Sequence, residues 1–130
     1  MTADPAAAPR LKTQIRLMLG EDIALGPGKA QLLAAIAAHG SIAAAGRELG
    51  MSYRRAWDLV ETMNRCFREP LVQSAAGGRH GGGAHLSPLG EQVLTLYLDL
   101  RRAVEREAAA FEGALTGLLR QPADPPADDA

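Results

Sequence analysis

The sequence has one cysteine, few aromatic residues and no long apolar run. Its 130 residues include a single cysteine, Cys66, and only 4% aromatic residues. A lone cysteine excludes an intramolecular disulfide and indicates an ordinary buried thiol in a reducing compartment. Nowhere do about eighteen uncharged apolar residues follow one another, and the start MTADPAAAPR lacks an apolar leader, so we expect no membrane partner and a cytoplasmic location. Abundant alanine and leucine favour a mainly helical fold of one domain over a sandwich or barrel.

The net charge is close to zero, but the two signs are unevenly distributed. The formal charge is −1, which taken alone argues against a nucleic-acid partner. Over residues 10–85, however, ten lysines and arginines outnumber six acids, whereas acids outnumber arginines from residue 86 onward. Any contact with a polyanion therefore belongs to the first part of the chain.

The two ends of the chain are rich in alanine and proline and have no apolar periodicity. We predict that residues 1–9 and 121–130 are flexible tails, the second of them acidic, around a folded domain at residues 10–120. Within this domain, the string LKTQIRLML at residues 11–19 alternates apolar and polar positions. This period of two predicts a half-buried strand at the edge of a small sheet.

Three helices are predicted to follow, each with its own start and stop signals. The first occupies residues 26–40, from a Gly-Pro start to a closing glycine. The second is short, with Ser41 as its N-cap and Gly50 as its stop. The third begins after Ser52 and ends before Pro70. Its apolar positions follow a helical period and predict one buried face, made of Ala56, Leu59, Val60, Met63 and Phe67.

A hairpin and a long helix are predicted after the third helix. A glycine-rich loop separates the β-prone pair Leu71 and Val72 from the short run 84–87, which is typical of a hairpin with a long tip. Ser87 can cap the last helix, and Pro88 suits its first turn. About thirty helical residues would span roughly 45 Å, which is more than a small domain is wide. We therefore predict a dimer interface on this helix, formed by Leu89, Val93, Leu96, Leu100, Val104, Phe111 and Leu115.

Two short helices joined by a tight glycine turn form a helix-turn-helix, whose second helix places its N-terminal residues in the DNA major groove. The first turn of that helix holds Tyr53, Arg54 and Arg55, where free backbone N–H groups already favour phosphate. An arginine there can bind guanine through two hydrogen bonds or hold a phosphate. Asp58 follows Arg54 by four residues, so it can orient that guanidinium or accept from cytosine.

Two features near this helix have competing interpretations. Tyr53 and Trp57 are four residues apart, and we interpret them as a bracing pair with a buried Trp57 rather than as base contacts. The glycine-rich tip AAGGRHGGGAH fits a wing in which Arg79, followed by His80, approaches the minor groove. A disordered linker has a similar composition, but the position of the tip after a helix-turn-helix favours the wing.

Residues 26–101 resemble the N-terminal winged helix-turn-helix domain of the ModE family of molybdate-responsive transcriptional regulators. The resemblance is carried by GSIAAAGRELGMSYRRAWDLVETMNRCFREPLV and GGRHGGGAHLSPLGEQVLTLY, and the arrangement is also similar to the DNA-binding domain of LysR-type regulators. It implies a homodimer that pairs through the long last helix and the N-terminal strand region and reads an inverted repeat in double-stranded DNA. The resemblance also implies that the motif near DNA comprises Ser41, Ser52, Tyr53, Arg54, Arg55 and Arg79.

The chain departs from that family in two respects. Full-length members continue into C-terminal molybdate-binding domains, for which we expect no room after Arg120, so molybdate sensing does not carry over. His80 stands where the family's wing has glycine or a basic residue. We predict a DNA-binding regulator without cofactor or metal, either constitutive or controlled by an unknown effector or partner protein. The predicted DNA-binding residues are Ser41, Ser52, Tyr53, Arg54, Arg55, Asp58, Arg79 and His80.

Two other functions are compatible with the sequence. A metal or redox sensor would draw its ligands from His39, Cys66, His80 and His85. Those residues have no usual ligand spacing. A protein-interaction module would use the acidic last helix to bind another regulator. An enzyme is not expected, because the sequence has no glycine-rich phosphate loop, nucleophile elbow or His-carboxylate metal motif.

Overall fold

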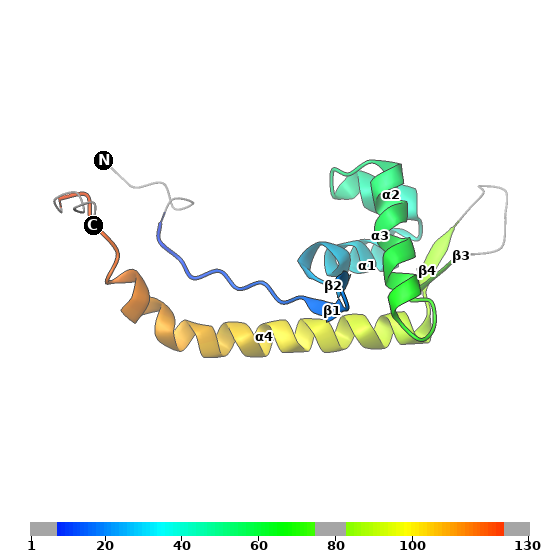
Figure 1. Ribbon diagram of the computed structural model, residues 1–130. Coiled ribbons are helices and arrows are strands. Elements are labelled where there is room, and N and C mark those ends of the chain that lie inside the picture. The colour runs from blue at the N-terminus through cyan, green and yellow to red at the C-terminus, as the bar shows by residue number, and fades with distance from the viewer. Residues whose placement is uncertain (1–7, 75–82, 124–130) are drawn as a thin grey trace. The chain divides into compact units, whose positions relative to one another are not determined.

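The computed structural model describes residues 8–74 and 83–123, and these ranges contain four helices and four short strands (Figure 1). The predicted fold class, a mainly helical winged helix-turn-helix with a long last helix, is confirmed. The tip of the hairpin, with Arg79 and His80, lies outside the described residues. In chain order the elements are β1 (Leu17–Leu19), β2 (Asp22–Leu25), α1 (Pro27–His39), α2 (Ile42–Glu48), α3 (Tyr53–Cys66), β3 (Val72–Ser74), β4 (Ala84–Leu86) and α4 (Pro88–Thr116).

The chain divides into two compact units. One unit is Gln14–Arg101 and contains the helix-turn-helix, the hairpin and the first half of α4. The other comprises Met1–Thr13 and Arg102–Ala130. In this second unit the backbone N–H of Leu11 donates to Oε2 of Glu112 at 2.9 Å, which ties the N-terminal segment to the end of α4.

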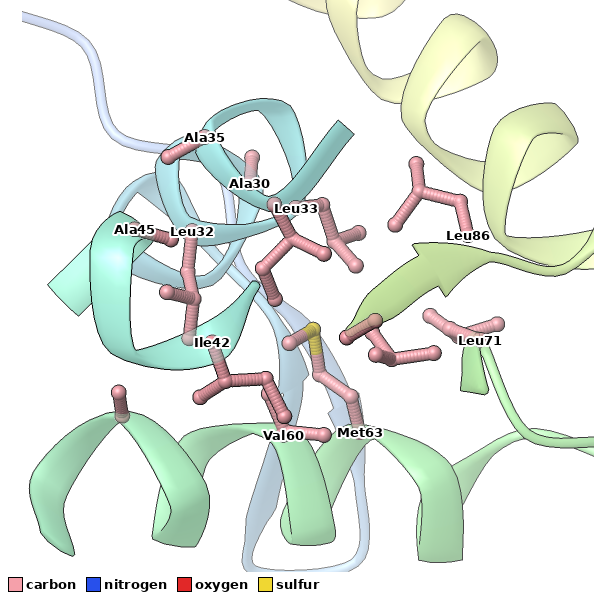
Figure 2. Packing of buried hydrophobic residues seen from close by; sticks show 14 of the residues in the cluster. Ala30, Leu32, Leu33, Ala35, Ile42, Ala45, Val60, Met63, Leu71 and Leu86 are labelled. Atoms are coloured by element: carbon pink, nitrogen blue, oxygen red, sulfur yellow. The ribbon is translucent and has the colours of Figure 1, made fainter. Parts of the chain in front are cut away.

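The hydrophobic core of the first unit lies between α1, α2 and α3. Leu32, Leu33 and Ile36 of α1 are fully buried, and Val60 and Met63 of α3 close the core from the opposite side (Figure 2). Full burial of an aliphatic side chain of this size stabilises a fold by about 1.5–3 kcal/mol. This core therefore decides which face of α3 is left for solvent.

The two predicted capping serines start α2 and α3. Oγ of Ser41 accepts from the backbone N–H of Ala44 at 2.9 Å. Oγ of Ser52 accepts from the backbone N–H of Arg55 at 3.1 Å. Each bond satisfies one of the N–H groups that a helix start leaves without a partner in the helix. Both predicted caps are confirmed.

Two glycines allow α2 and α3 to cross closely. Gly50 has a φ of +70°, the left-handed conformation in which glycine avoids the steric penalty of a Cβ. At Gly46 a Cβ would lie 3.3 Å from Cβ of Ala56 on α3 and 3.4 Å from the carbonyl oxygen of Met51. The turn therefore combines one glycine favoured by its backbone conformation with another that leaves room for Ala56 of α3.

The N-terminal strand is shorter than predicted. Only Leu17–Leu19 of the expected strand 11–19 forms β1, and its side chains are exposed rather than half-buried. It pairs antiparallel with β2, a strand that the sequence pattern missed, and Met18 lies opposite Ile23. The alternating pattern describes an extended chain, but a strand also needs a hydrogen-bonded partner. Because β2 has only four residues, the rest of residues 11–16 has no strand to pair with.

The start of α4 is packed tightly against the residue before β3. Oγ of Ser87 accepts from the backbone N–H of Gly90 at 3.0 Å and donates to the carbonyl of Pro70 at 2.6 Å, so the predicted cap is confirmed. A Cβ at Gly90 would overlap the carbonyl oxygen of Leu71. Glycine at this position permits the approach of the two segments. Within the described ranges neither α4 nor any other helix is long and apolar enough to cross a membrane.

We expect Gly90→Ala to lower the free energy of unfolding by about 1–3 kcal/mol, because the added methyl group forces α4 away from Leu71. The matched control is Gly113→Ala, also within α4, where a Cβ would meet no atom within 4 Å and alanine is the better helix former. Urea unfolding followed by circular dichroism measures both variants. Equal stability of the two variants would contradict the close packing at Gly90.

Candidate nucleic-acid interface

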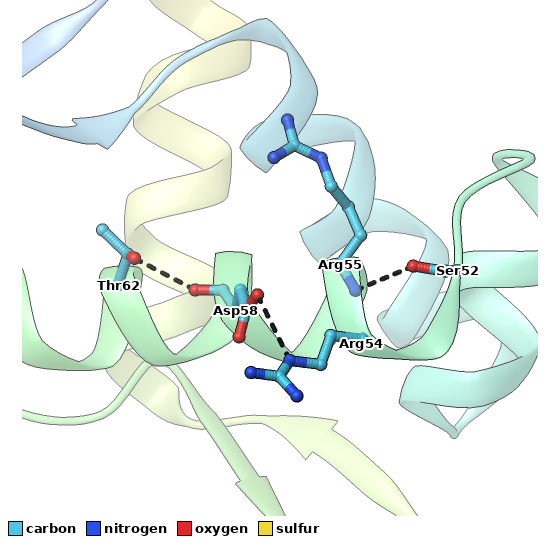
Figure 3. Close-up of polar contacts among 5 residues, drawn as sticks. All are labelled: Ser52, Arg54, Arg55, Asp58 and Thr62. Carbon is cyan, nitrogen blue, oxygen red and sulfur yellow. Dashed lines mark hydrogen bonds and ion pairs between the residues drawn. The ribbon is translucent and has the colours of Figure 1, made fainter.

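The outward face of α3 carries an exposed ion pair. Nε of Arg54 lies 3.9 Å from Oδ2 of Asp58, and the two side chains are 89% and 61% exposed. The hydroxyl of Thr62 donates to the carbonyl of Asp58 at 3.0 Å (Figure 3). An exposed pair of this kind contributes at most about 1 kcal/mol to stability. The Arg54 guanidinium can therefore leave Asp58 for another partner at little cost.

Arg55 points to a different side of α3 from Arg54 (Figure 3). Successive helical residues are about 100° apart around the axis, so adjacent arginines do not share a face. Arg55 lines a surface hollow of about 310 Å³ together with Lys29 from the first turn of α1 and Arg16 from the segment before β1. Lys29 and Arg16 were not predicted as site residues, because only the tertiary fold brings the three segments together.

The pKa of Lys29 reflects both burial and the charges around the hollow. Burial lowers the pKa of its ammonium group, and the positive charge of Arg55 acts in the same direction. Cys66 and Asp22 oppose this shift. The carboxylate of Asp22 also forms an ion pair with Arg65 at 3.9 Å. The hollow is thus a partly desolvated place where cationic groups outnumber the acid near them.

The predicted aromatic pair forms, but Trp57 is not buried. The rings of Tyr53 and Trp57 meet edge to face with centroids 6.2 Å apart, which is a favourable geometry. Trp57 nevertheless remains 39% exposed. The prediction of burial was wrong because Ala56 and Val60 occupy the core-facing side of α3, and Trp57 lies on the flank of that face. The exposed surface of α3 therefore includes aromatic as well as charged side chains.

Asn64 holds the hairpin against α3. Its Oδ1 accepts from the backbone N–H groups of Leu71 and Val72 at 2.8 and 3.1 Å, and its Nδ2 donates to the carbonyl of Val72 at 3.2 Å. On the other strand, the N–H of Ala84 donates to the carbonyl of Gly40 at 2.8 Å. The base of the wing is thereby attached to both α3 and the end of α1. Asn64 was not predicted, since a polar residue on a helix does not reveal a partner in a later segment.

The other predicted DNA-binding residues have different surroundings. Ser41 is half-buried and Ser52 is exposed, and both use Oγ to cap a helix. Arg79 and His80 are outside the described ranges, so the wing contact stays a prediction. The described structure brings Ser52, Tyr53, Arg54, Arg55 and Asp58 together at the start of α3.

The predicted dimer residues fall into two groups in the first unit. Leu89 and Val93 are half-buried and pack against the core. Leu96 and Leu100 are 60% and 48% exposed. The second pair lies in a mainly apolar groove whose other lining residues are Ile15, Arg16, Leu17, Leu25, Phe67, Val93 and Tyr97. In the second unit Val104 is half-buried, whereas Phe111 and Leu115 are exposed.

The side chains considered for a metal or redox sensor do not form a metal site in the part of the chain that the structure describes. No group of three potential ligands occurs there. Nε2 of His39 lies 4.0 Å from a carboxylate oxygen of Glu48, and His85 is exposed on β4. Cys66 is half-buried rather than buried as predicted, because it lies at the end of α3, where the core face of that helix ends.

Residues 28–91 match the family described as bacterial regulatory helix-turn-helix protein, lysR family. The chain is 44% identical over 91 residues to the molybdenum-pterin-binding protein MopB of Rhodobacter capsulatus, which covers 70% of the chain and 34% of MopB. It is 42% identical over 105 residues to the molybdenum transport protein ModE of Azotobacter vinelandii, which covers 79% of the chain and 36% of that relative. It is 36% identical over 94 residues to the DNA-binding transcriptional dual regulator ModE of Escherichia coli K12, which covers 72% of the chain and 36% of that relative.

The chain spans about a third of the length of these relatives. The matched part of the chain includes the two helices of the helix-turn-helix, the hairpin and the start of α4. The predicted resemblance is confirmed.

We expect Asn64→Ala to speed hydrogen exchange at the backbone N–H groups of Leu71 and Val72 by roughly tenfold or more, because each loses its acceptor. Asn64→Asp keeps an acceptor at the same place and should keep most of the protection. Exchange measured by NMR separates the two variants. Unchanged protection in Asn64→Ala would show that something other than Asn64 holds the hairpin on α3.

Proposed function

We propose that the protein is a transcriptional regulator that binds an inverted-repeat operator in double-stranded DNA as a homodimer, because residues 28–91 match the bacterial regulatory helix-turn-helix family named lysR. The proposal is carried by the first turn of α3, where the Arg54 side chain is almost fully exposed beside Asp58. An exposed guanidinium at the start of the second helix is what a guanine contact in the major groove requires.

In this proposal the charged pair on α3 has a specific division of roles. Arg54 binds O6 and N7 of a guanine through two hydrogen bonds. Asp58 either keeps the guanidinium extended or accepts from a neighbouring cytosine. Ser52 caps the helix and leaves the other N–H groups of the first turn toward phosphate. Tyr53 provides apolar surface beside this contact, and Ser41, Arg79 and His80 complete the proposed interface.

The proposed homodimer buries the apolar groove of the first unit. Leu17, Leu96 and Leu100 are about half exposed there, and in one copy alone their apolar surface faces water. A second copy that places the same residues against the groove removes this surface by a two-fold symmetric contact. Two such copies would carry two α3 helices, as the reading of an inverted repeat requires.

Two of the relatives have names that refer to molybdenum, and we propose that the regulated genes serve molybdenum uptake or use. Selection of genomic DNA fragments by the purified protein, with and without molybdate, tests the proposal. We expect an inverted repeat to be enriched. Failure to enrich any sequence would contradict operator binding and favour a protein-interaction module.

We expect Arg54→Ala to abolish discrimination between the enriched operator and unrelated duplex while circular dichroism shows an intact fold. The loss corresponds to about 1–3 kcal/mol per missing guanine contact. Fluorescence anisotropy with both duplexes gives the ratio of the two affinities.

Arg54→Lys is the matched variant for charge. Lysine keeps the attraction to phosphate but cannot reproduce the planar two-bond contact. It should therefore retain affinity for unrelated duplex and still lose discrimination. Full discrimination by either variant would mean that another residue reads the operator.

We expect Leu96→Asp to weaken dimerisation by at least roughly tenfold, because a carboxylate would have to be buried at the apolar contact. Leu118→Asp is the control, since Leu118 lies beyond the end of α4 and is 84% exposed. Sedimentation equilibrium measures the two association constants. Equal values would place the dimer contact elsewhere.

A further inference from the structure

We propose that Arg16, Lys29 and Arg55 form a clamp for a DNA backbone phosphate beside α3, and that Arg54 alone of the two adjacent arginines reads a base. This inference rests on the proposed function and adds to it the contact that sets the position of α3 in the groove. It also assigns different tasks to two residues that the sequence places side by side.

The clamp is built from three segments that are separate in the sequence. Arg16 precedes β1, Lys29 lies in the first turn of α1 and Arg55 lies in the first turn of α3, and all three line the same hollow. Cγ of Arg16 would lie 3.5 Å from a Cβ at Gly26. The aliphatic part of Arg16 thus lies beside the glycine that precedes α1, and both residues line the hollow.

The positive charges that line the hollow are poorly neutralised by acidic side chains of the protein. Among the described residues, neither Lys29 nor Arg55 has a carboxylate within ion-pair distance, and the Arg16 guanidinium donates to the neutral amide of Gln14 at 3.0 Å. The carboxylate of Asp22, whose charge acts on Lys29, also forms an ion pair with Arg65. A phosphate in the hollow would supply the missing negative charge, and the half-buried position of Lys29 would strengthen its attraction to that phosphate.

The location of the hollow favours a contact with the DNA backbone over a contact with a DNA base. Arg55 points toward the segment before β1 and the start of α1, whereas Arg54 points away from them (Figure 3). When α3 lies in the major groove, residues on its flank meet the sugar-phosphate strand that borders the groove. The start of α1 adds to this preference, because its N-cap is Gly26 and no side chain caps it, so its free N–H groups also favour phosphate.

The test is the salt dependence of DNA affinity for Arg16→Gln, Lys29→Gln and Arg55→Gln, each measured with the enriched operator and with unrelated duplex. A residue that neutralises a phosphate contributes about 0.9 to the slope of log affinity against log salt concentration. Because the three side chains share one phosphate, each variant should reduce the slope by a measurable part of this amount. Affinity should fall by the same factor on both duplexes, so that the specificity ratio stays unchanged.

Three controls keep the result unambiguous. Arg106→Gln removes one exposed positive charge from α4 in the second unit and should leave the slope unchanged. Lys29→Arg keeps the charge and should keep the slope, which separates loss of charge from damage to the fold. Arg54→Gln should lower the specificity ratio, in contrast to the three clamp variants.

Several outcomes would overturn the clamp. If the protein binds DNA but the three variants behave like Arg106→Gln, the hollow does not hold a phosphate and the proposed function survives. If Arg55→Gln lowers the specificity ratio as Arg54→Gln does, Arg55 reads a base. Tight one-to-one binding of inorganic phosphate in the absence of DNA would assign the hollow to a free anion. Absence of DNA binding by the unchanged protein would remove both proposals.

Discussion

The structure depends on the burial of one face of α1 against one face of α3. The side chains of Leu33 and Ile36 on α1 and of Met63 on α3 are all fully buried. A fourteen-residue helix such as α3 is marginal by itself in water, so its stability and orientation come from this packing. Once Ala56, Val60 and Met63 face the core, geometry leaves the side of Arg54 and Asp58 in solvent. The exposed charged face is therefore a consequence of the core.

Side-chain hydrogen bonds connect the base of the wing and the start of α4 to the packed helices. Asn64 binds three backbone groups of the segment that leads into and begins β3, and Ser87 connects the start of α4 to the carbonyl of Pro70. Buried or half-buried backbone groups need such partners, and a missing one is costly. Together with the close approach at Gly90, these bonds give the base of the wing and the start of α4 defined positions relative to α3. The two elements proposed to contact DNA, α3 and the wing, are thus connected by these hydrogen bonds.

Sequence reasoning succeeded where the signal was local. Ser41, Ser52 and Ser87 could be identified as caps because a cap bonds to an N–H three residues ahead, and Gly50 could be identified as a stop because its role depends on its own φ angle. It failed where the partner was distant along the chain. The length of β1 depended on β2, and the role of Asn64 depended on Leu71 and Val72, seven and eight residues further on. For Trp57, residue type predicted burial, but the helix flank on which it lies leaves it partly exposed.

The sequence by itself determined the order of the four helices, the capped starts of α2, α3 and α4 and the placement of two arginines in the first turn of α3. Hydrophobic period, caps and left-handed glycines act over a few residues, so these features can be derived without the fold. Only the tertiary structure decided which segments of the chain Arg55 faces. The hollow of Arg16, Lys29 and Arg55 likewise exists only after β1, α1 and α3 pack together, because proximity between distant segments is set by the burial of the core and not by any local pattern.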